Sequence, residues 1–129
     1  MSEAATHQPK LKGELILTLT ALYAEMIRFQ NLKDMQGVIN CIHSESMGRV
    51  TAKQLLESIF IQFTFNNTIV SHKYVGADNE FIYYRFKQKI EKIVGPDFKN
   101  MLSENLVLFR KENGNWKIWD QLVIKIQSI

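Results

Sequence analysis

The segment from Asn105 to Ile126 constrains the fold more than any other part of the chain. It holds two β-rich runs on either side of Glu112-Asn113-Gly114-Asn115. An Asn-Gly pair readily adopts the positive φ angles that a tight hairpin turn requires. The sequence therefore predicts a long, twisted antiparallel hairpin at the C-terminal end of the fold.

The first half of the chain has a helical pattern instead. Apolar residues recur at spacings of three and four, which predicts helices at about 11–30, 35–42 and 55–63. Asn31 or Asp34 could cap the second helix with its side-chain oxygen. The segment from Thr51 to Gln54 has the form of a capping box that would open the third helix.

Beyond Thr64 the period becomes strand-like. Four strands are expected, at about 68–75, 80–94, 99–111 and 115–127. They exceed the usual strand length of roughly five or six residues, so strong twist or a bulge is expected. Helices followed by consecutive strands predict an α+β fold, with three N-terminal helices packed on a strongly curved antiparallel sheet.

Size and charge narrow the function classes. With 129 residues, 46% of them hydrophobic, the chain is expected to form one domain at 11–129 after a flexible tail at 1–10. The net charge is only +3, and the Lys and Arg residues are scattered among Asp and Glu. A nucleic-acid-binding protein usually concentrates its positive charge on one face. No stretch approaches the roughly 20 apolar residues that cross a bilayer. Neither nucleic acid nor a membrane is therefore an expected partner.

The chemistry-bearing residues show no metal or cofactor pattern. The three histidines, His7, His43 and His72, are scattered, and the glycines form no phosphate loop, so no metal or cofactor is expected. The single cysteine, Cys41, cannot form an internal disulfide, which fits a reducing cytoplasm. Its apolar neighbours favour a core residue over a nucleophile.

Strand alternation sorts residues by face. In the second strand the set that faces the helices is expected to be Ile82, Tyr84, Phe86, Gln88 and Ile90. In the last strand the same logic turns a second set inward: Trp116, Ile118, Asp120, Leu122 and Ile124.

A few polar groups would then converge on an apolar cavity, which is the usual make-up of a small-molecule site. The expected ligand pocket consists of Tyr23, Tyr84, Phe86, Gln88, Trp116 and Asp120. A buried Asp120 would have a raised pKa, suited to proton transfer. Alternatively Asp120 lies at the rim, or hydrogen-bonds Tyr84 or a backbone N–H.

The opposite sheet face carries aromatic residues. Phe81, Tyr83 and Trp119 would form an exposed apolar patch there. Burial against a second copy is the simplest remedy, because symmetric dimers are the commonest oligomers. A homodimer through the outer sheet face is therefore expected.

The whole pattern resembles the nuclear transport factor 2-like superfamily, which shares its fold with ketosteroid isomerases and polyketide-cyclase-like (SnoaL-like) proteins. The resemblance rests on Tyr23 in the first helix, on the sequence from Asn31 to Met35 and on the hairpin from Leu108 to Trp119. It implies a cone-shaped α+β barrel, also called cystatin-like, with a pocket at its mouth and dimerisation through the sheet. The chain also resembles bacterial members of the superfamily that have no assigned activity.

The isomerase-like members carry a proton-shuttling acid on an extra strand after the second helix. Here that region is short, and Glu45 is its single acid. Tyr23 could match the oxyanion-donating tyrosine, and it also fits the core. The expected function is non-catalytic binding of a small apolar or amphipathic ligand, or a dimeric scaffold. The alternatives are an isomerase, dehydratase or cyclase that uses Asp120 or Glu45 with Tyr23 or Tyr84, and a trafficking partner like the superfamily's namesake.

Overall fold

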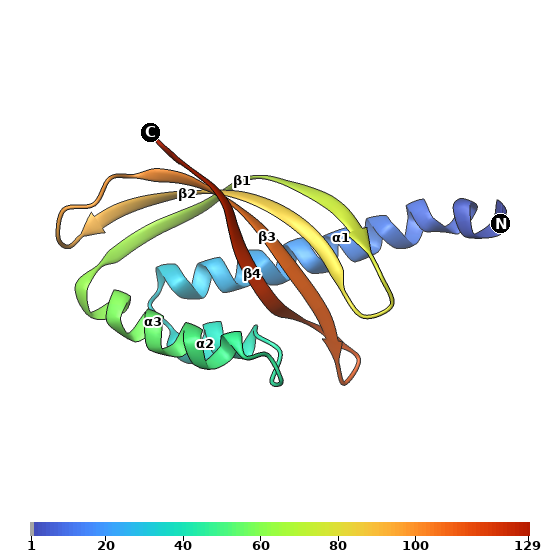
Figure 1. Ribbon diagram of the computed structural model, residues 1–129, viewed down its shortest axis with the longest axis horizontal. Helices are drawn as coiled ribbons and strands as arrows, with labels where there is room; N and C mark the ends of the chain where they lie inside the picture. Colours follow the sequence, from blue (N-terminus) through green and yellow to red (C-terminus); the bar gives the residue numbers. More distant parts are fainter. Residues whose placement is uncertain (1) are drawn as a thin grey trace.

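Three helices precede a four-stranded antiparallel sheet in the computed structural model, which describes the backbone of residues 2–129 and the side chains of residues 13–129 (Figure 1). The elements are α1 (Ser2–Asn31), α2 (Met35–Asn40), α3 (Gly48–Gln62), β1 (Thr64–Ala77), β2 (Ile82–Val94), β3 (Met101–Glu112) and β4 (Asn115–Ser128). The strands lie in the order β1-β2-β3-β4. The α+β class and the antiparallel sheet predicted from the sequence are confirmed.

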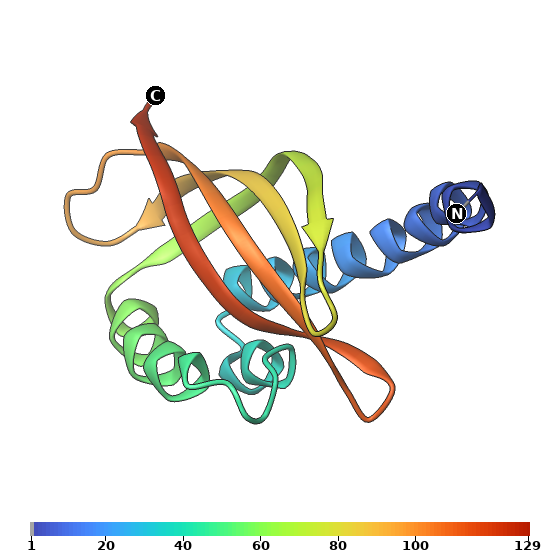
Figure 2. The same ribbon diagram turned by 45° about the vertical axis from the view of Figure 1, so that its right-hand side comes forward.

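The sheet is strongly curved. Its strands arch over α1, while α2 and α3 lie together at one end of the molecule (Figures 1 and 2). The pairing of β1 with β2 and that of β3 with β4 both contain register shifts. Such bulges bend a strand and increase its twist, so they account for the curl of these long strands.

The hairpin between β3 and β4 has the predicted turn. Asn113 has a φ of 51° and Gly114 a φ of 82°, and Glu112 pairs with Asn115 across the turn. Positive φ at both central residues is the conformation that matches the twist of a two-residue hairpin.

The helix boundaries differ from the predicted ones. Helix α1 begins at Ser2 rather than at residue 11, while the flexibility predicted for residues 1–10 stays a prediction. Asp34 caps α2, accepting the Gly37 N–H at 3.0 Å. The capping box at Thr51 is wrong, because α3 begins at Gly48 and has no side-chain cap.

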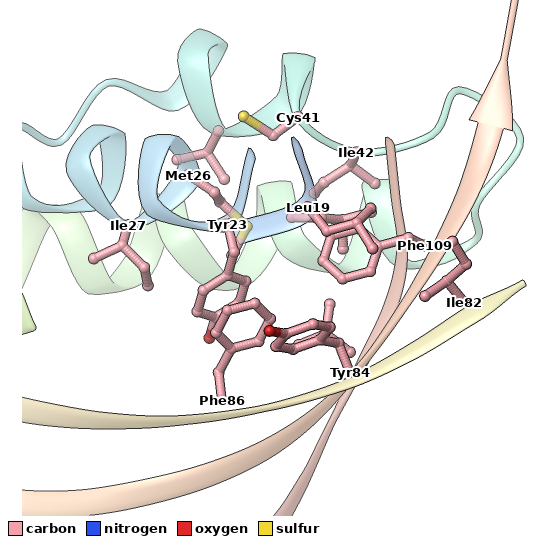
Figure 3. Packing of buried hydrophobic residues seen from close by; sticks show 13 residues of the cluster. Leu19, Tyr23, Met26, Ile27, Cys41, Ile42, Ile82, Tyr84, Phe86 and Phe109 are labelled. Atoms are coloured by element: carbon pink, nitrogen blue, oxygen red, sulfur yellow. The ribbon is translucent and has the colours of Figure 1, made fainter. Parts of the chain in front are cut away.

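The core lies between α1 and the concave face of the sheet. Tyr23 from α1 stacks on Phe86 of β2 with ring centroids 3.9 Å apart, and Phe86 stacks in turn on Tyr84 at 4.8 Å (Figure 3). Cys41 is buried in the same cluster, and burial raises the pKa of its thiol. Its predicted role as a core residue is confirmed.

The predicted faces hold for β2, and in β4 they hold only as far as Ile118. Ile82, Tyr84, Phe86 and Gln88 are all buried. In β4, Ile118 pairs with Phe109 and Asp120 with Leu108, so Trp119 is an extra bulged residue. The bulge moves the next residues to the other face, and simple alternation therefore assigns them wrongly.

Candidate ligand pocket

A pocket of about 540 Å³ lies between α3, the end of α1 and the concave face of the sheet. Its walls are mostly apolar, and α3 contributes Ala52, Leu55, Leu56, Ile59 and Phe60. At one end of the wall are Phe63, Phe65 and Phe98, whose rings contact one another. The exposed side chains of Thr51, Leu55 and Asp120 are among the lining residues, so the pocket opens to solvent beside α3.

Neutral polar side chains line the sheet side of this pocket. Gln88 from β2 and Ser103 and Asn105 from β3 are each at least nine-tenths buried. Asn105 accepts the Ser103 hydroxyl proton at 2.9 Å and donates to the Gln88 side-chain oxygen at 3.3 Å. We call Asn67, Gln88, Ser103, Asn105 and Gln121 the polar floor, since all five line the pocket.

The Tyr23 hydroxyl ties this floor to α1. It donates to Gln88 Oε1 at 2.5 Å and accepts from Asn105 Nδ2 and Gln121 Nε2, each at 3.3 Å. Burial of the hydroxyl raises the pKa of Tyr23 to about 12. The phenol therefore stays neutral, and its hydrogen-bonding positions are filled by the protein.

The floor continues to β1 through a second amide pair. Gln88 Nε2 donates to Asn67 Oδ1 at 3.3 Å, and Asn67 exchanges hydrogen bonds with Asn31 at the end of α1. Neutral amides and a hydroxyl thus satisfy one another below the cavity, as buried polar groups generally must.

Two of the six predicted pocket residues line the pocket, and four do not. Gln88 lies in the floor, and Asp120 is on the lining but exposed. Tyr23, Phe86 and Tyr84 are buried in the core beneath the floor, and Trp116 packs against that core. The Tyr84 hydroxyl meets His72 Nδ1 at 2.6 Å, away from the pocket lining.

The inward, buried position predicted for Asp120 is wrong. The bulge at Trp119 places Asp120 opposite Leu108, and the residue is exposed. Its carboxylate accepts the Gln121 N–H at 2.8 Å. Asp120 therefore matches the alternative prediction, in which it lies at the rim and accepts a hydrogen bond from a backbone N–H. Leu122 and Ile124, also predicted to face inward, are exposed as well.

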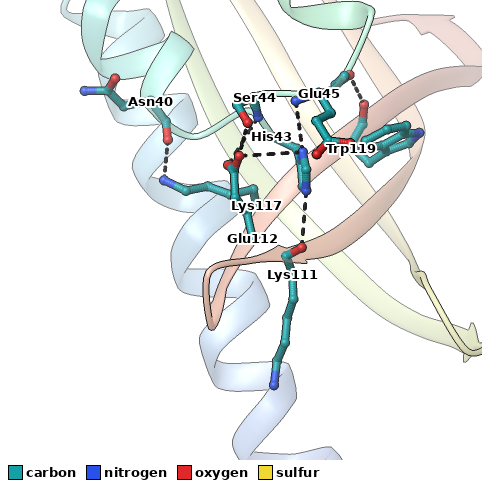
Figure 4. A network of polar contacts seen from close by, with 9 residues as sticks. Asn40, His43, Ser44, Glu45, Lys111, Glu112, Lys117 and Trp119 are labelled. Carbon is teal, nitrogen blue, oxygen red and sulfur yellow. Dashed lines mark hydrogen bonds and ion pairs between the residues drawn. The ribbon is translucent and has the colours of Figure 1, made fainter.

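Glu45 lies in a loop outside the pocket lining. This loop packs on the β3–β4 hairpin, where His43 Nε2 meets the Lys111 carbonyl at 3.2 Å (Figure 4). The Glu45 N–H donates to His43 Nδ1, and the Glu45 side chain is exposed. Ile42 also pairs with Ile118 of β4. The predicted Tyr23–Glu45 pair is therefore not brought together.

Four residues of the floor were not identified from the sequence: Asn67, Ser103, Asn105 and Gln121. A signal existed for the two on β3, because Ser103 and Asn105 alternate in phase with Val107 and Phe109, which are buried. The inward position of Gln121 depends on the bulge, which alternation does not reveal.

Two features of the described residues bear on metal binding and membrane insertion. Among the described residues, no three His, Cys, Asp or Glu side chains gather as metal ligands would. None of the helices in the described part of the chain has the length and apolar character needed to cross a bilayer.

Solved structures place this architecture in a known class. The hexachlorocyclohexane dehydrochlorinase LinA-type3 from Novosphingobium barchaimii matches with a TM-score of 0.71 and 7% identity, covering 92% of each chain. A Nostoc punctiforme protein of unknown function with a cystatin-like fold gives a TM-score of 0.69 at 11% identity, covering 86% of this chain and 90% of its own. A Mycobacterium tuberculosis protein of unknown function gives 0.77 at 15%, covering 93% and 76%.

The chain therefore has a cystatin-like α+β fold with a pocket between its helices and its sheet. Within that class it belongs to the family of the anti-sigma-I factor RsgI9 C-terminal domain, whose model matches residues 21–129. No curated protein matches the sequence.

Proposed function

We propose that this domain binds a small apolar or amphipathic molecule in the pocket without transforming it. The observation that carries the proposal is the saturated Tyr23 hydroxyl beneath an apolar cavity. Proton transfer needs an acid or base within hydrogen-bond reach of the substrate. Here the buried part of the lining is neutral, whereas Lys33 and Asp120 are exposed.

The fold itself is compatible with either role. One structural neighbour is a dehydrochlorinase and others have unknown function. Because their sequence identity to this chain is low, the similarity shows a shared fold and no shared activity. The family is named after the C-terminal domain of an anti-sigma factor, a name that describes regulation rather than catalysis. The pocket chemistry favours ligand binding, and the family name points to no reaction.

A thermal-shift screen with small apolar compounds tests the proposal, because a ligand that binds the native state stabilises it by mass action. The matched variants are Ala52→Phe, which fills the pocket from α3, and Lys53→Phe, which adds the same ring at an exposed neighbour outside the lining. We expect hits with the wild type and Lys53→Phe and their loss with Ala52→Phe. An absence of hits, or equal shifts for both variants, would contradict ligand binding.

We further propose that two copies associate through the outer sheet face, as a dimeric scaffold for the pocket. On this face Phe81 contacts Tyr83 and Trp119, and the Arg110 guanidinium lies 4.9 Å from the Trp119 ring centroid. Leu122, which pairs with Leu106, is half-exposed. Light scattering after size exclusion should give twice the 15.0 kDa chain mass, and Leu122→Lys should reduce it. A wild-type mass of one chain at high concentration would exclude the dimer.

A further inference from the structure

The polar floor has unused hydrogen-bonding capacity, and its pattern describes the ligand group that would fit there. Inside the floor, the Ser103 hydroxyl gives its proton to Asn105 Oδ1, so toward the cavity it can only accept. Gln121 donates one amide N–H to Tyr23, and its Oε1 makes no hydrogen bond within the described residues. Both residues line the pocket, so two acceptors face a ligand.

Donors are available beside these acceptors. Gln88 Nε2 and Asn67 Nδ2 each carry two N–H groups and each uses one of them inside the network, on Asn67 Oδ1 and Asn31 Oδ1 respectively. The floor therefore offers a ligand both hydrogen-bond acceptors and hydrogen-bond donors. Asn105 offers less, because its side-chain nitrogen donates to Tyr23 and Gln88 and its oxygen accepts from Ser103.

Charge is the second constraint on the ligand group. The floor holds no ionised side chain, and Gln88, Ser103 and Asn105 are at least nine-tenths buried. An isolated carboxylate or ammonium is expensive to transfer into such surroundings without a partner of opposite charge. The exposed Lys33 and Asp120 lie on the lining, outside the buried floor.

We propose that the pocket recognises a neutral hydroxyl group on a compact apolar body, with the hydroxyl on the polar floor and the apolar body against α3. A hydroxyl both donates and accepts, which matches the unused groups of the floor. An ether lacks the proton that Ser103 or Gln121 would accept, and an acid or amine is charged near neutral pH. The inference deepens the proposed ligand-binding function and rests on it.

The test uses four probes with one rigid body: 1-adamantanol, 1-methoxyadamantane, adamantane-1-carboxylate and 1-adamantylammonium. Binding is followed by the two tryptophan indole N–H signals in NMR titrations, since Trp119 lines the pocket and Trp116 does not. We expect 1-adamantanol to shift the Trp119 signal far more than that of Trp116. It should bind about tenfold more tightly than the other three, because each of them leaves a buried group of the floor unpaired or buries a charge.

Two variants link any preference to the floor. Gln121→Leu and Ser103→Ala each remove one of the two free acceptors, so either variant should reduce the advantage of 1-adamantanol over 1-methoxyadamantane. Lys125→Gln, at an exposed position of β4 outside the lining, is the control and should keep the full preference.

The outcomes separate this inference from the function on which it rests. If the thermal-shift screen finds ligands that Ala52→Phe abolishes, yet 1-adamantanol fails to bind or binds no better than its ether or its charged analogues, the hydroxyl preference is wrong and the binding function stands. If neither the screen nor any probe detects binding, both proposals fail. An advantage that persists in Gln121→Leu and Ser103→Ala would also overturn the assignment to the floor.

Discussion

At the scale of single residues, Tyr23 separates the core from the pocket. Its ring is fully buried against Phe86. Its hydroxyl joins α1 to three strands, because it bonds Gln88 of β2, Asn105 of β3 and Gln121 of β4. The sequence shows Tyr23 as one member of an apolar helical stripe. It could not show the hydrogen bonds, because their partners lie 65 to 98 residues away along the chain.

Replacing Tyr23 with phenylalanine should destabilise the fold. The change keeps the ring and removes the hydroxyl, which removes the closer of the two donors to the Gln88 oxygen and takes an acceptor from Asn105 and Gln121. We expect the free energy of unfolding, measured with urea, to fall by about 1–3 kcal/mol. Tyr83→Phe is the control: its hydroxyl bonds Asp78 at the surface, and the change should stay within about 0.5 kcal/mol. Equal effects of the two changes would contradict a special role for Tyr23.

The stability should also depend on alkaline pH through Tyr23. Burial raises the pKa of Tyr23 from an ordinary value of 10.0 to about 12 in the folded state. The folded state therefore holds the proton where the unfolded state releases it, so this contribution is complete below pH 10 and declines as the pH rises toward 12. The difference in unfolding free energy between wild type and Tyr23→Phe should narrow over this window. A constant difference from pH 9 to pH 12 would argue against the shift.

At the scale of elements, period-2 alternation predicted β2 correctly and failed in β4 beyond Ile118. In β2 the pairing with β3 is regular, so every second residue faces the core. In β4 the register shifts at Trp119 and again at Ile124, and each shift exchanges the two faces. Asp120 was therefore predicted to face inward, at the position that Gln121 occupies. The position of a bulge depends on how the strand pairs with its neighbour, and this pairing cannot be read from the sequence of one strand alone.

The helical glycines Gly13 and Gly37 should respond in opposite ways to substitution by alanine. A Cβ on Gly37 would lie 2.4 Å from Cδ1 of the Phe29 ring, whereas a Cβ on Gly13 meets nothing within 4 Å. Gly13→Ala should raise the free energy of unfolding by about 0.5–1 kcal/mol through helix propensity. Gly37→Ala should lower it by about 1–3 kcal/mol, since the ring must move. Stabilisation by both changes would show that α2 and α1 pack less closely than described.

Helix caps offer a matched comparison between an observed cap and a wrongly predicted one. Asp34 accepts the Gly37 N–H at the start of α2, whereas Thr51 lies inside α3 and is exposed. Asp34→Ala should cost about 0.5–2 kcal/mol in urea unfolding. Thr51→Ala should be neutral or slightly stabilising, because alanine is the better residue within a helix. A larger loss at Thr51 than at Asp34 would restore the capping box as the start of α3.

At the scale of the whole molecule, the two proposed binding surfaces lie on opposite faces of one sheet. The concave face carries the core and the polar floor, and the convex face carries the aromatic cluster of Phe81, Tyr83 and Trp119. Trp119 belongs to both, because it lines the pocket and touches Phe81. Dimerisation through the convex face would leave the pocket mouth beside α3 open to a ligand.

The outer wall of the pocket should be the least stable part of the fold. None of the α3 residues is buried, whereas α1 contributes Leu19, Tyr23, Met26 and Ile27 to the core. Segments with few buried apolar contacts open with a smaller free energy than the core does. Amide hydrogen exchange should therefore be faster in α3 than in residues 19–27 of α1, and a ligand that bridges α3 and the floor should slow exchange in α3 most. Ligand-induced protection spread evenly over β1 to β4, with α3 unchanged, would mean that the molecule binds elsewhere.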